Sequence, residues 1–263
     1  MLSKNTNFLI SIIMPSYNSG EYIRKSIDSV LRQSYKNLEL IIIDDCSNDN
    51  TIEVISSYKD ERIKILKNES NQGAGITRNK GLSLANGRFI CFLDSDDYWR
   101  DDKLEKQLNF MLSNKIDFCF SAYDRVSEDD AFICKIGVPE KVNYSDMLKV
   151  CSIGCLTVMF DKEKFTDFSM PSIRKRQDYA LWLKLLKQTP YAYGISESLG
   201  SYNIRENSIS SNKLDAAKHQ WRIYRDIENL NIFSASYYFS HYAFNGFFRS
   251  KFPSLAKKLG LLK

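Results

Sequence analysis

Three almost uninterrupted apolar runs constrain the fold of this 263-residue chain more than any other feature. They cover residues 9–14, 38–43 and 89–93 and consist almost entirely of aliphatic and aromatic side chains. Such runs are typical of strands buried on both faces, as in a parallel sheet covered by helices. Segments with helical spacing of apolar residues, such as residues 23–31, separate them. We therefore expect an α/β fold with a mostly parallel sheet flanked by helices.

Further elements follow from hydrophobic periodicity and from residues that start or stop helices. Pro15 is expected to end the first strand. Asn18 and Glu21 have the spacing of a capping box, so the first helix is expected to begin there. More helices are predicted at residues 51–58, 76–85, 104–112, 178–187 and 212–230. More strands are predicted at residues 62–66, 116–123, 131–136 and 155–160. The strands at 116–123 and 131–136 are expected to be antiparallel.

Polar side chains follow the three apolar runs at the point where each strand should end. They are Pro15-Ser16-Tyr17, Asp44-Asp45 and Asp94-Ser95-Asp96-Asp97. In open parallel sheets, ligands bind beyond the carboxyl ends of the strands. We therefore expect the three clusters to converge on one rim.

Asp94, Asp96 and Asp97 place three carboxylates within four residues. Their mutual repulsion requires compensation, and a hard divalent cation such as Mn²⁺ or Mg²⁺, which prefers oxygen ligands, supplies it. The alternative is a solvated acidic turn that caps a helix beginning near Asp101. The strand before the cluster and the two other polar clusters favour a metal and nucleotide site.

Two other groups are expected at the same rim. A carboxylate at Asp44-Asp45 could accept the imide hydrogen of a uracil ring, although Ser47 or Asp49 could also cap the next helix. The segment 73–78 resembles a dinucleotide fingerprint, but Arg78 stands where its third glycine belongs. Arg78 could instead reach a base or a phosphate oxygen, or it could be an exposed helix residue.

The bulk composition excludes several classes of protein. Hydrophobic residues make up 43% and charged residues 26% of the chain, as in ordinary globular domains. The chain has no run of the ~20 apolar residues that a membrane span needs and no recognisable secretory signal. We expect a cytoplasmic protein whose six cysteines are free thiols, mostly small buried hydrophobes rather than zinc ligands. Serine-hydrolase and P-loop motifs are absent from the sequence.

The net charge of +5 belongs to the C-terminal tail. Residues 231–263 contain five basic and no acidic side chains, and the rest of the chain contains 32 of each. A neutral body argues against nucleic-acid binding. Nine aromatic residues crowd into positions 233–252 of this tail. The tail could lie on an anionic membrane surface, or its aromatic residues could pack on the catalytic domain or on a second copy of the chain.

Five segments together resemble inverting glycosyltransferases of family two, over about residues 8–210. They are Ile13–Asn18, the Asp-Asp-x-Ser-x-Asp motif within Glu39–Thr51, the Asn-x-Gly and Arg-Asn-x-Gly segment within Asn71–Gly81, the Asp-x-Asp site within Phe92–Asp97, and Arg176–Trp182. The resemblance implies the GT-A fold, a Rossmann-like sheet with helices, as a catalytic domain at residues 8–210. Residues 211–263 would then form a helical C-terminal region that associates with a membrane or forms oligomers.

The resemblance also implies roles for individual residues. Asp178 would be the general base, and Asp96 and Asp97 would hold Mn²⁺ or Mg²⁺. The nucleotide-sugar would be bound by Pro15, Tyr17, Asp45, Arg78, Asp94 and Ser95. Two positions depart from the family pattern: Gln177 replaces a glutamate, and Tyr202–Arg205 lacks a histidine, which leaves Arg205 to neutralise a leaving diphosphate.

The implied activity is metal-dependent transfer of a hexosyl or N-acetylhexosaminyl group, with inversion, from a UDP-sugar. The acceptor would be a hydroxyl of a glycan or of a lipid-linked saccharide. This would serve the synthesis of a surface polysaccharide, such as lipopolysaccharide, O-antigen or capsule, at the cytoplasmic face of the inner membrane. Two alternatives are a nucleotidyltransferase, which would need a glycine-rich basic loop after the first strand, and a non-catalytic module that binds nucleotide-sugar or glycan.

Overall fold

The computed structural model describes residues 7–204 and 213–251. Its strands are β1 (Ile10–Ser16), β2 (Leu38–Asp44), β3 (Ile63–Lys67), β4 (Phe89–Phe92), β5 (Tyr98–Trp99), β6 (Phe118–Val126), β7 (Phe132–Ile136), β8 (Lys141–Val142), β9 (Met159–Asp161) and β10 (Ala192–Asn203). In the described part of the chain they form one sheet in the order β3-β2-β1-β4-β9-β6-β10-β5, with β7 beside β6 and β8 beside β10.

The N-terminal half of the sheet is parallel. In β1, Ile12 lies beside Leu40 of β2 on one side and beside Cys91 of β4 on the other. β9 then runs antiparallel to both β4 and β6, and β6 and β10 are again parallel to each other. The expected α/β fold with a mostly parallel central sheet is confirmed, as is the antiparallel pairing of β6 with β7.

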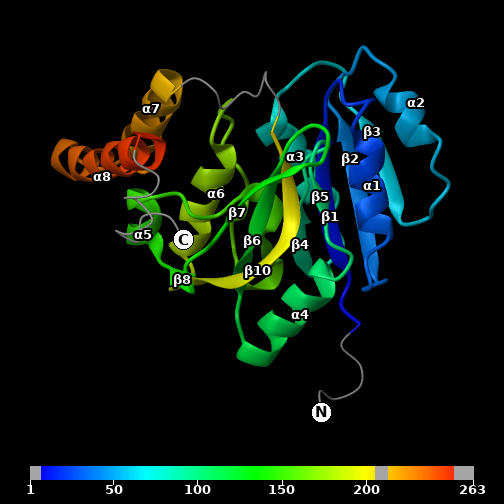
Figure 1. Ribbon diagram of the computed structural model, residues 1–263, viewed down its shortest axis with the longest axis horizontal. Helices are drawn as coiled ribbons and strands as arrows, with labels where there is room; N and C mark the ends of the chain where they lie inside the picture. Colours follow the sequence, from blue (N-terminus) through cyan, green and yellow to red (C-terminus); the bar gives the residue numbers. More distant parts are fainter. Residues whose placement is uncertain (1–6, 205–212, 252–263) are drawn as a thin grey trace.

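Helices cover both faces of this sheet. They are α1 (Ile23–Leu31), α2 (Thr51–Ser56), α3 (Ala74–Leu84), α4 (Lys103–Asn114), α5 (Tyr144–Lys149), α6 (Gln177–Leu186), α7 (Lys213–Arg222) and α8 (Ile232–Lys251), with short 3₁₀ turns at Cys155–Thr157 and Lys162–Lys164 and a π-helical turn at Ile223–Ile227. Figure 1 shows α7 and α8 together beside α5 and α6, at the end of the molecule opposite β3.

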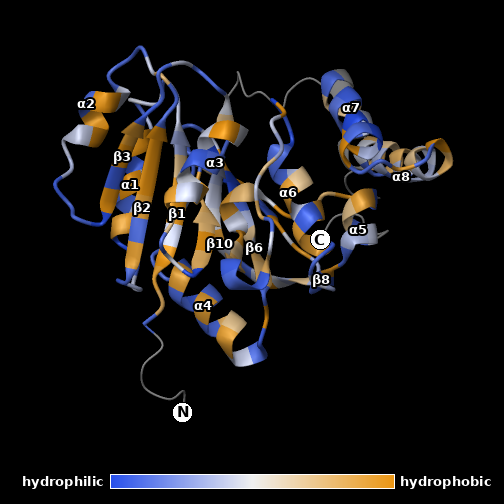
Figure 2. Ribbon diagram, turned by 180° about the vertical axis from the view of Figure 1, so that it is seen from behind, coloured by the Kyte–Doolittle hydropathy of each residue, from blue (hydrophilic) through white to orange (hydrophobic). Residues whose placement is uncertain are grey.

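Alternation along the strands divides the interior into two cores. Ile13 and Ile43 belong to the core that includes side chains of α3 and α6, and Ile12 and Ile42 belong to the core that includes side chains of α1 and α4. Figure 2 shows the apolar strands between these helices. α3 lies so close to the sheet that a Cβ at Gly81 would be 2.5 Å from Ile13 Cγ2. This close packing fixes the position of α3, and hence of Arg78, against the strand ends.

Two predictions about the first strand and helix were wrong. β1 continues through Pro15 to Ser16, because the missing N–H of Pro15 would face β4, where pairing has already ended at Ile13. The capping box of Asn18 and Glu21 does not form: α1 begins at Ile23 without a side-chain cap. Asn18 is instead used to hold the neighbouring loop.

Several predictions about the second half also need correction. The strand expected at residues 155–160 is only β9, because residues 155–157 form a 3₁₀ turn. β10 was not predicted, since its sequence contains two glycines and three serines and lacks a regular apolar pattern.

Most of the cysteines are not buried hydrophobes: Cys91 and Cys119 are buried, but Cys151 is exposed and the other three are half-buried. All six are free thiols, as expected.

The C-terminal helices were predicted as one long helix followed by an aromatic tail. In the structure α7 ends at Arg222, a π-helical turn follows, and α8 occupies most of the tail. The inner face of α8 carries Ala235 and Asn245, which are buried. Within residues 7–204 and 213–251, no helix has both the length and the hydropathy of a bilayer-crossing segment. The helical C-terminal region is confirmed, and its boundary at residue 211 stays a prediction.

Candidate active site

The candidate site lies where the strand order reverses between β1 and β4. Chain connections leave β1 toward β2 and β3 on one side, whereas β4 lies on the other side, so a crevice opens beyond the carboxyl ends of β1 and β4. The backbone N–H of Asp45 donates to the Ser16 carbonyl at 2.7 Å, and that of Leu93 donates to the Ile13 carbonyl at 3.1 Å. These bonds bring the three predicted polar clusters to one rim, as expected.

The loops that follow β1 and β2 are tied to each other. The Asn18 N–H donates to Ser47 Oγ and the Asn48 N–H donates to Asn18 Oδ1, both at 2.9 Å. Asp44 is fully buried and accepts from the Ser47 N–H at 3.0 Å, so it shapes this turn rather than facing a ligand. Pro15 is buried, and Tyr17 is 46% exposed at the rim. The exposed Tyr17 ring is therefore available to a planar ligand.

Asp45 is buried at the rim and holds the segment that leads into α3. Its Oδ1 accepts from Asn68 Nδ2 at 2.8 Å and from the Gln72 N–H at 2.9 Å, and its Oδ2 accepts from the Gly73 N–H at 2.8 Å. Burial alone would raise the pKa of Asp45, but the hydrogen bonds from Gln72, Asn68 and Gly73 outweigh it, so the pKa is lowered. The Thr77 hydroxyl is a fourth donor, so these bonds use the roughly four lone-pair positions of the carboxylate.

Arg78 of α3 forms a buried ion pair with Asp94, the residue that follows Leu93 after β4. Burial opposes the charge of Arg78, but Asp94, Cys155 and Asp178 act in the other direction and raise its pKa, so the guanidinium stays protonated. Arg78 is 5% exposed, which rules out the exposed-residue alternative. Among the described residues, its Nε has no hydrogen-bond partner, and this buried N–H is therefore available to a ligand.

The remaining residues of the acidic cluster have different surroundings. Ser95 Oγ lies 2.7 Å from Ser19 Oγ, which joins this loop to the loop after β1. Asp97 is 2% exposed, and its Oδ1 accepts from the Asn203 N–H of β10 at 3.0 Å, whereas Asp96 is half-buried. Because Ser95 and Asp97 are buried, and because α4 begins only at Lys103, the cluster is not a solvated helix cap.

Asp96 and Asp97 suit a divalent cation whose coordination a diphosphate completes. In the part of the chain that the structure describes, no group of three or more His, Cys, Asp or Glu side chains forms a ready-made metal cage. Mg²⁺ and similar ions are usually held by one or two carboxylates together with substrate phosphates, so two neighbouring carboxylates at an open rim fit this chemistry. The buried, unpaired Nε of Arg78 beside Asp94 adds a second group for an anionic ligand.

Asp178 reaches the same site from α6, far along the chain. Gln177, next to it, packs against α3, since a Cβ at Gly75 would lie 3.1 Å from Gln177 Cγ. Burial strongly raises the pKa of the Cys155 thiol, and charged side chains around the thiol modify it. These side chains are Arg78, Asp94, Asp178 and Asp97. The contact between Gln177 and α3 therefore brings the start of α6, which carries the predicted general base, to the helix that carries the Arg78–Asp94 ion pair.

Sequence reasoning missed several residues of this site. Asn68, at the end of β3, could have been found because it follows a strand, as Asp45 does. Cys155 was assigned to a strand, and Asn203 depends on the unpredicted β10. Arg205, to which we assigned the leaving diphosphate, lies outside the described residues.

Comparison with known proteins agrees with this geometry. Residues 11–149 match the model of the family described as glycosyl transferase family 2. TuaG of Bacillus subtilis (strain 168), named for teichuronic acid biosynthesis, is 48% identical over 90% of this chain and 95% of its own length. WfgD of Escherichia coli, a UDP-Glc:alpha-D-GlcNAc-diphosphoundecaprenol beta-1,3-glucosyltransferase, is 44% identical over 85% of this chain and 88% of its own length.

Solved structures show the same fold. S. aureus TarS, in a crystal structure with UDP-GlcNAc, superposes with a TM-score of 0.73 at 23% identity, over 94% of this chain and 75% of the TarS chain. The mannosyltransferase PcManGT of Pyrobaculum calidifontis, with GDP-Man and Mn²⁺, superposes with a TM-score of 0.66 at 14% identity, over 95% and 78% of the two chains. Fold, site and sequence together show that this chain belongs to glycosyl transferase family 2.

Proposed function

We propose that this glycosyltransferase moves a hexosyl or N-acetylhexosaminyl group from a UDP-sugar to a hydroxyl of a lipid-linked saccharide, with inversion at the anomeric carbon. The observation that carries the proposal is the packing of Gln177, the neighbour of Asp178, against Gly75 of α3, the helix that also carries the Arg78–Asp94 ion pair. The relative WfgD is named for UDP-Glc and for a diphosphoundecaprenol acceptor, which supports this donor and this class of acceptor. The product would enter a surface polysaccharide.

The donor nucleotide would lie over the rim between β1 and β4. In this proposal Tyr17 and Pro15 line the base pocket, and Asp45, whose hydrogen bonds shape the loop before α3, lies beside the uracil ring. Arg78, Asp94 and Ser95 would bind the nucleotide-sugar beyond the base. The buried Nε of Arg78, which has no partner among the described residues, supports a direct contact with the donor.

Asp96 and Asp97 would hold Mn²⁺ or Mg²⁺ together with the diphosphate. When bound, the cation would offset negative charge on the departing diphosphate. The Asn203 N–H holds one oxygen of Asp97, which limits rotation of this carboxylate. Arg78, which stays protonated, would add a second positive charge through its ion pair with Asp94.

Asp178 would act as the general base. It would take the proton from the acceptor hydroxyl while that oxygen forms a bond to the anomeric carbon. The bond between the anomeric carbon and the diphosphate oxygen breaks at the same time, and its electron pair leaves with UDP. A single displacement of this kind inverts the anomeric centre, and the acceptor oxygen carries the sugar as product.

Asp178→Asn tests this assignment. Turnover of UDP-glucose or UDP-N-acetylglucosamine with a short polyprenyl diphosphate-linked N-acetylglucosamine should fall by ~10² or more, because the amide cannot accept the proton. Binding of UDP with Mn²⁺ should stay unchanged. Asp167→Asn, on the surface before α6, is the control and should keep full turnover. Equal turnover of Asp178→Asn and wild type would remove Asp178 from this role. Absence of turnover in the wild type, with UDP binding intact, would favour the non-catalytic binding module.

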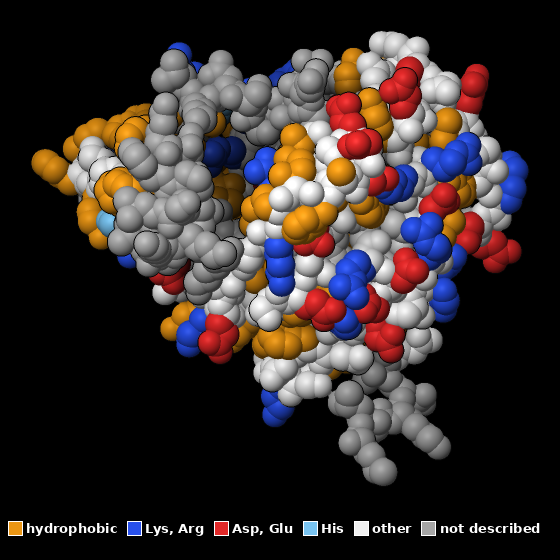
Figure 3. Space-filling view, in the orientation of Figure 1, with side chains coloured by type: hydrophobic (Ala, Val, Ile, Leu, Met, Phe, Trp, Pro, Cys, Tyr) orange, Lys and Arg blue, Asp and Glu red, His pale blue; other side chains and the backbone are white. Residues whose placement is uncertain are grey.

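We extend the proposal to the place where the enzyme works. The outer face of α8 exposes Phe233, Tyr237, Phe244 and Phe247, of which Phe233 is 84% exposed. Figure 3 shows hydrophobic side chains gathered at this end of the molecule. From residue 231 onward the sequence contains basic but no acidic residues, which favours an anionic surface as the partner. We propose that α8 lies on the cytoplasmic face of the inner membrane, where a lipid-linked acceptor would be found.

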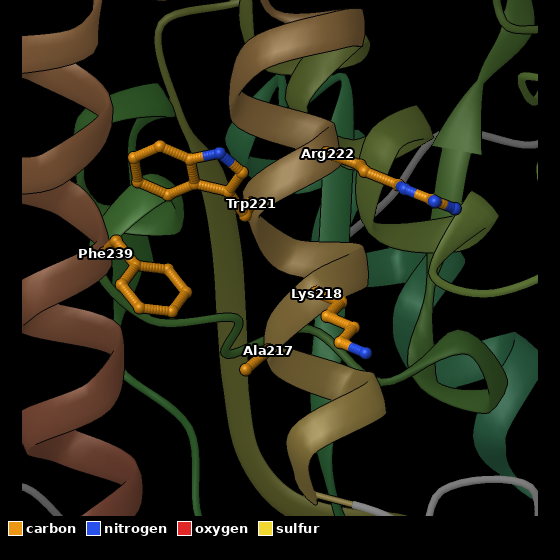
Figure 4. A pocket seen from close by; sticks show the side chains of 5 residues that line it. All are labelled: Ala217, Lys218, Trp221, Arg222 and Phe239. Carbon is orange, nitrogen blue, oxygen red and sulfur yellow. The ribbon is translucent and has the colours of Figure 1, made fainter.

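A pocket between α7 and α8 supports this orientation. It has a volume of about 440 Å³ and is lined by Ala217, Lys218, Trp221, Arg222 and Phe239. Figure 4 shows Trp221 and Phe239 between the two helices, whereas Lys218 and Arg222 project from α7 on the side away from α8. The rings of Trp221 and Phe239 meet edge to face at 5.4 Å. An apolar pocket beside two cations suits a lipid phosphate with part of its chain.

Vesicle pelleting tests the membrane contact. The double variant Phe244→Ser, Phe247→Ser should pellet less than wild type with vesicles that contain anionic phospholipid, and neither protein should pellet with neutral vesicles. Phe132→Ser is the matched control, since Phe132 is 66% exposed on β7, away from α8. Equal pelleting of the double variant and wild type would contradict the proposed contact of α8 with the membrane. A loss of self-association in the double variant, measured by sedimentation without vesicles, would instead assign the face to a second copy of the chain.

A further inference from the structure

The residue that begins helix α6 is anchored to both C-terminal helices. Arg176 precedes Gln177 and Asp178, and its guanidinium donates to Gln220 Oε1 of α7 and, at 2.9 Å, to the hydroxyl of Tyr242 in α8. The guanidinium carbon also lies 5.1 Å from the centre of the Tyr242 ring. One side chain therefore connects the start of α6 with Gln220 of α7 and Tyr242 of α8, which lie 44 and 66 residues further along the chain.

A second path joins the same elements on the other side of Asp178. Tyr179 is 1% exposed, and its hydroxyl accepts from Gln220 Nε2 at 3.1 Å and donates to the Met147 carbonyl at 3.0 Å. Gln220 is itself 2% exposed, so it bridges Arg176 and Tyr179 in a buried setting. The two residues around the Gln177-Asp178 pair are thus held by one glutamine of α7.

The backbone of Arg176 has an unfavourable conformation. Its φ is 61° and its ψ is 24°, a left-handed conformation that is unfavourable for a residue with a side chain. Glycine would adopt this backbone conformation more easily than arginine, as Gly73 does with its positive φ. The side-chain bonds to Gln220 and Tyr242 account for an arginine at this position.

Lys175 adds a further connection from the same turn. It forms an ion pair with Asp215 of α7. Both side chains are about one-third exposed, so this pair contributes less than the buried bonds of Arg176. It is a second link between the residues just before α6 and helix α7.

We infer that Arg176 is a positioning residue through which α7 and α8 set the orientation of Asp178. The inference rests on the proposed role of Asp178 as the general base. A base must lie within hydrogen-bond reach of the acceptor hydroxyl, and a displacement of about 1 Å can reduce turnover by ~10². The C-terminal helices therefore contribute to the position of the catalytic base. Helix α8 exposes aromatic side chains on its outer face, and on its inner face Tyr242 holds Arg176, which precedes Asp178 by two residues.

Two tyrosines of α8 provide a matched test. The Tyr242 hydroxyl is bonded to Arg176, whereas the Tyr238 hydroxyl lies 3.3 Å from Ser145 Oγ of α5. Tyr242→Phe should lower kcat roughly fivefold or more, with an unchanged KM for the UDP-sugar and an unchanged Tm. Tyr238→Phe removes the same atom from the same helix and should leave kcat unchanged. Equal kcat values of Tyr242→Phe, Tyr238→Phe and wild type would overturn the inference.

Arg176→Gly tests the anchor from the other end, because glycine accepts the left-handed backbone while removing the guanidinium. It should lower kcat by ~10², and in an Asp178→Asn background it should cause no further loss, since Arg176 acts through Asp178. Losses that multiply in the double variant would show that Arg176 acts on its own or by general destabilisation.

Hydrogen exchange separates this inference from the proposed function. In Tyr242→Phe, the amides that begin the hydrogen-bond ladder of α6, starting with Ala180, whose N–H donates to the Arg176 carbonyl at 3.1 Å, should exchange faster than in Tyr238→Phe and wild type, whatever the activity of the protein. Unchanged exchange at these amides would contradict the anchor itself. If exchange rises as expected but wild type shows no transfer, or Asp178→Asn keeps full turnover, the failure belongs to the proposed function and not to the anchor.

Discussion

Arg78 and Asp94 form an ion pair in which the Arg78 side chain is 6% exposed and the Asp94 side chain is 32% exposed. The pair joins α3 to the loop after β4 and links two of the predicted nucleotide-binding residues directly. Because water reaches Asp94 but not Arg78, substitutions of the two partners should change the free energy of unfolding by different amounts.

We expect Arg78→Met to lower the free energy of unfolding by about 2 kcal/mol, less than the 3–5 kcal/mol seen when fully buried pairs are broken, because Asp94 can be solvated. Arg78→Met with Asp94→Asn should be less destabilised than the sum of the single variants, because the double variant leaves no uncompensated charge. Urea unfolding of the four proteins measures this coupling. Strict additivity would show that the two side chains do not stabilise each other.

A second prediction concerns the divalent cation. Titration of UDP into wild type should show an affinity at least ~10-fold higher with Mn²⁺ than with a chelator, because the cation would bridge carboxylate and diphosphate. Asp96→Asn should lose most of this difference. Asp101→Asn, an exposed neighbour of the cluster, is the control and should behave like wild type. Metal-dependent binding that persists in Asp96→Asn would place the cation elsewhere.

The part of the site built on the parallel strands was predictable from the sequence because its signals are local. An apolar run that ends in Asp45 or Asp94 marks both a buried strand and a polar rim, and the rim follows from the geometry of parallel sheets. The direct contacts at this rim were not predictable. Whether Asp45 faces solvent or holds Gln72 and Gly73 depends on the path of an irregular loop, which has no periodic signal.

The second half of the chain was harder to predict for a related reason. β10 contains Gly194 and Gly200 and has register shifts in its pairing with β6, so it shows neither alternation nor a continuous apolar run. Its place in the sheet is set by pairing with distant strands rather than by its own propensity. Consequently Asn203 was noticed only as a departure from a family pattern, although its backbone holds Asp97.

A third prediction isolates that backbone bond. Asn203→Pro removes the N–H that donates to Asp97 Oδ1, whereas Asn203→Ala keeps the N–H and removes only the side chain. We expect Asn203→Pro to weaken Mn²⁺-dependent UDP binding several-fold more than Asn203→Ala, because Asp97 then loses a fixed orientation. Calorimetric titration of both variants checks this. Equal binding by the two would mean that other partners of Asp97 suffice to orient it.

The fourth prediction concerns pH and Asp45. Hydrogen bonds hold the pKa of Asp45 below its value in the unfolded chain, which is about 3.9. Because the pKa is lower in the folded state, the unfolded state binds more protons at pH values between the two pKa values. The contribution of Asp45 to stability is therefore fully present above about pH 4. It is lost as the pH falls through the folded-state pKa. Asp45→Asn lacks this contribution at every pH.

The free energy of unfolding should therefore differ between wild type and Asp45→Asn by about 1–3 kcal/mol at pH 7, the range for a buried hydrogen-bonded group that loses its partners. The difference should narrow as the pH falls below about 4, because wild-type Asp45 then also becomes neutral. Urea unfolding without nucleotide, at several pH values, measures both proteins under the same conditions. A difference that stays constant from pH 7 to the acid limit would mean that the charge of Asp45 does not hold the loop before α3, and that its geometry alone does.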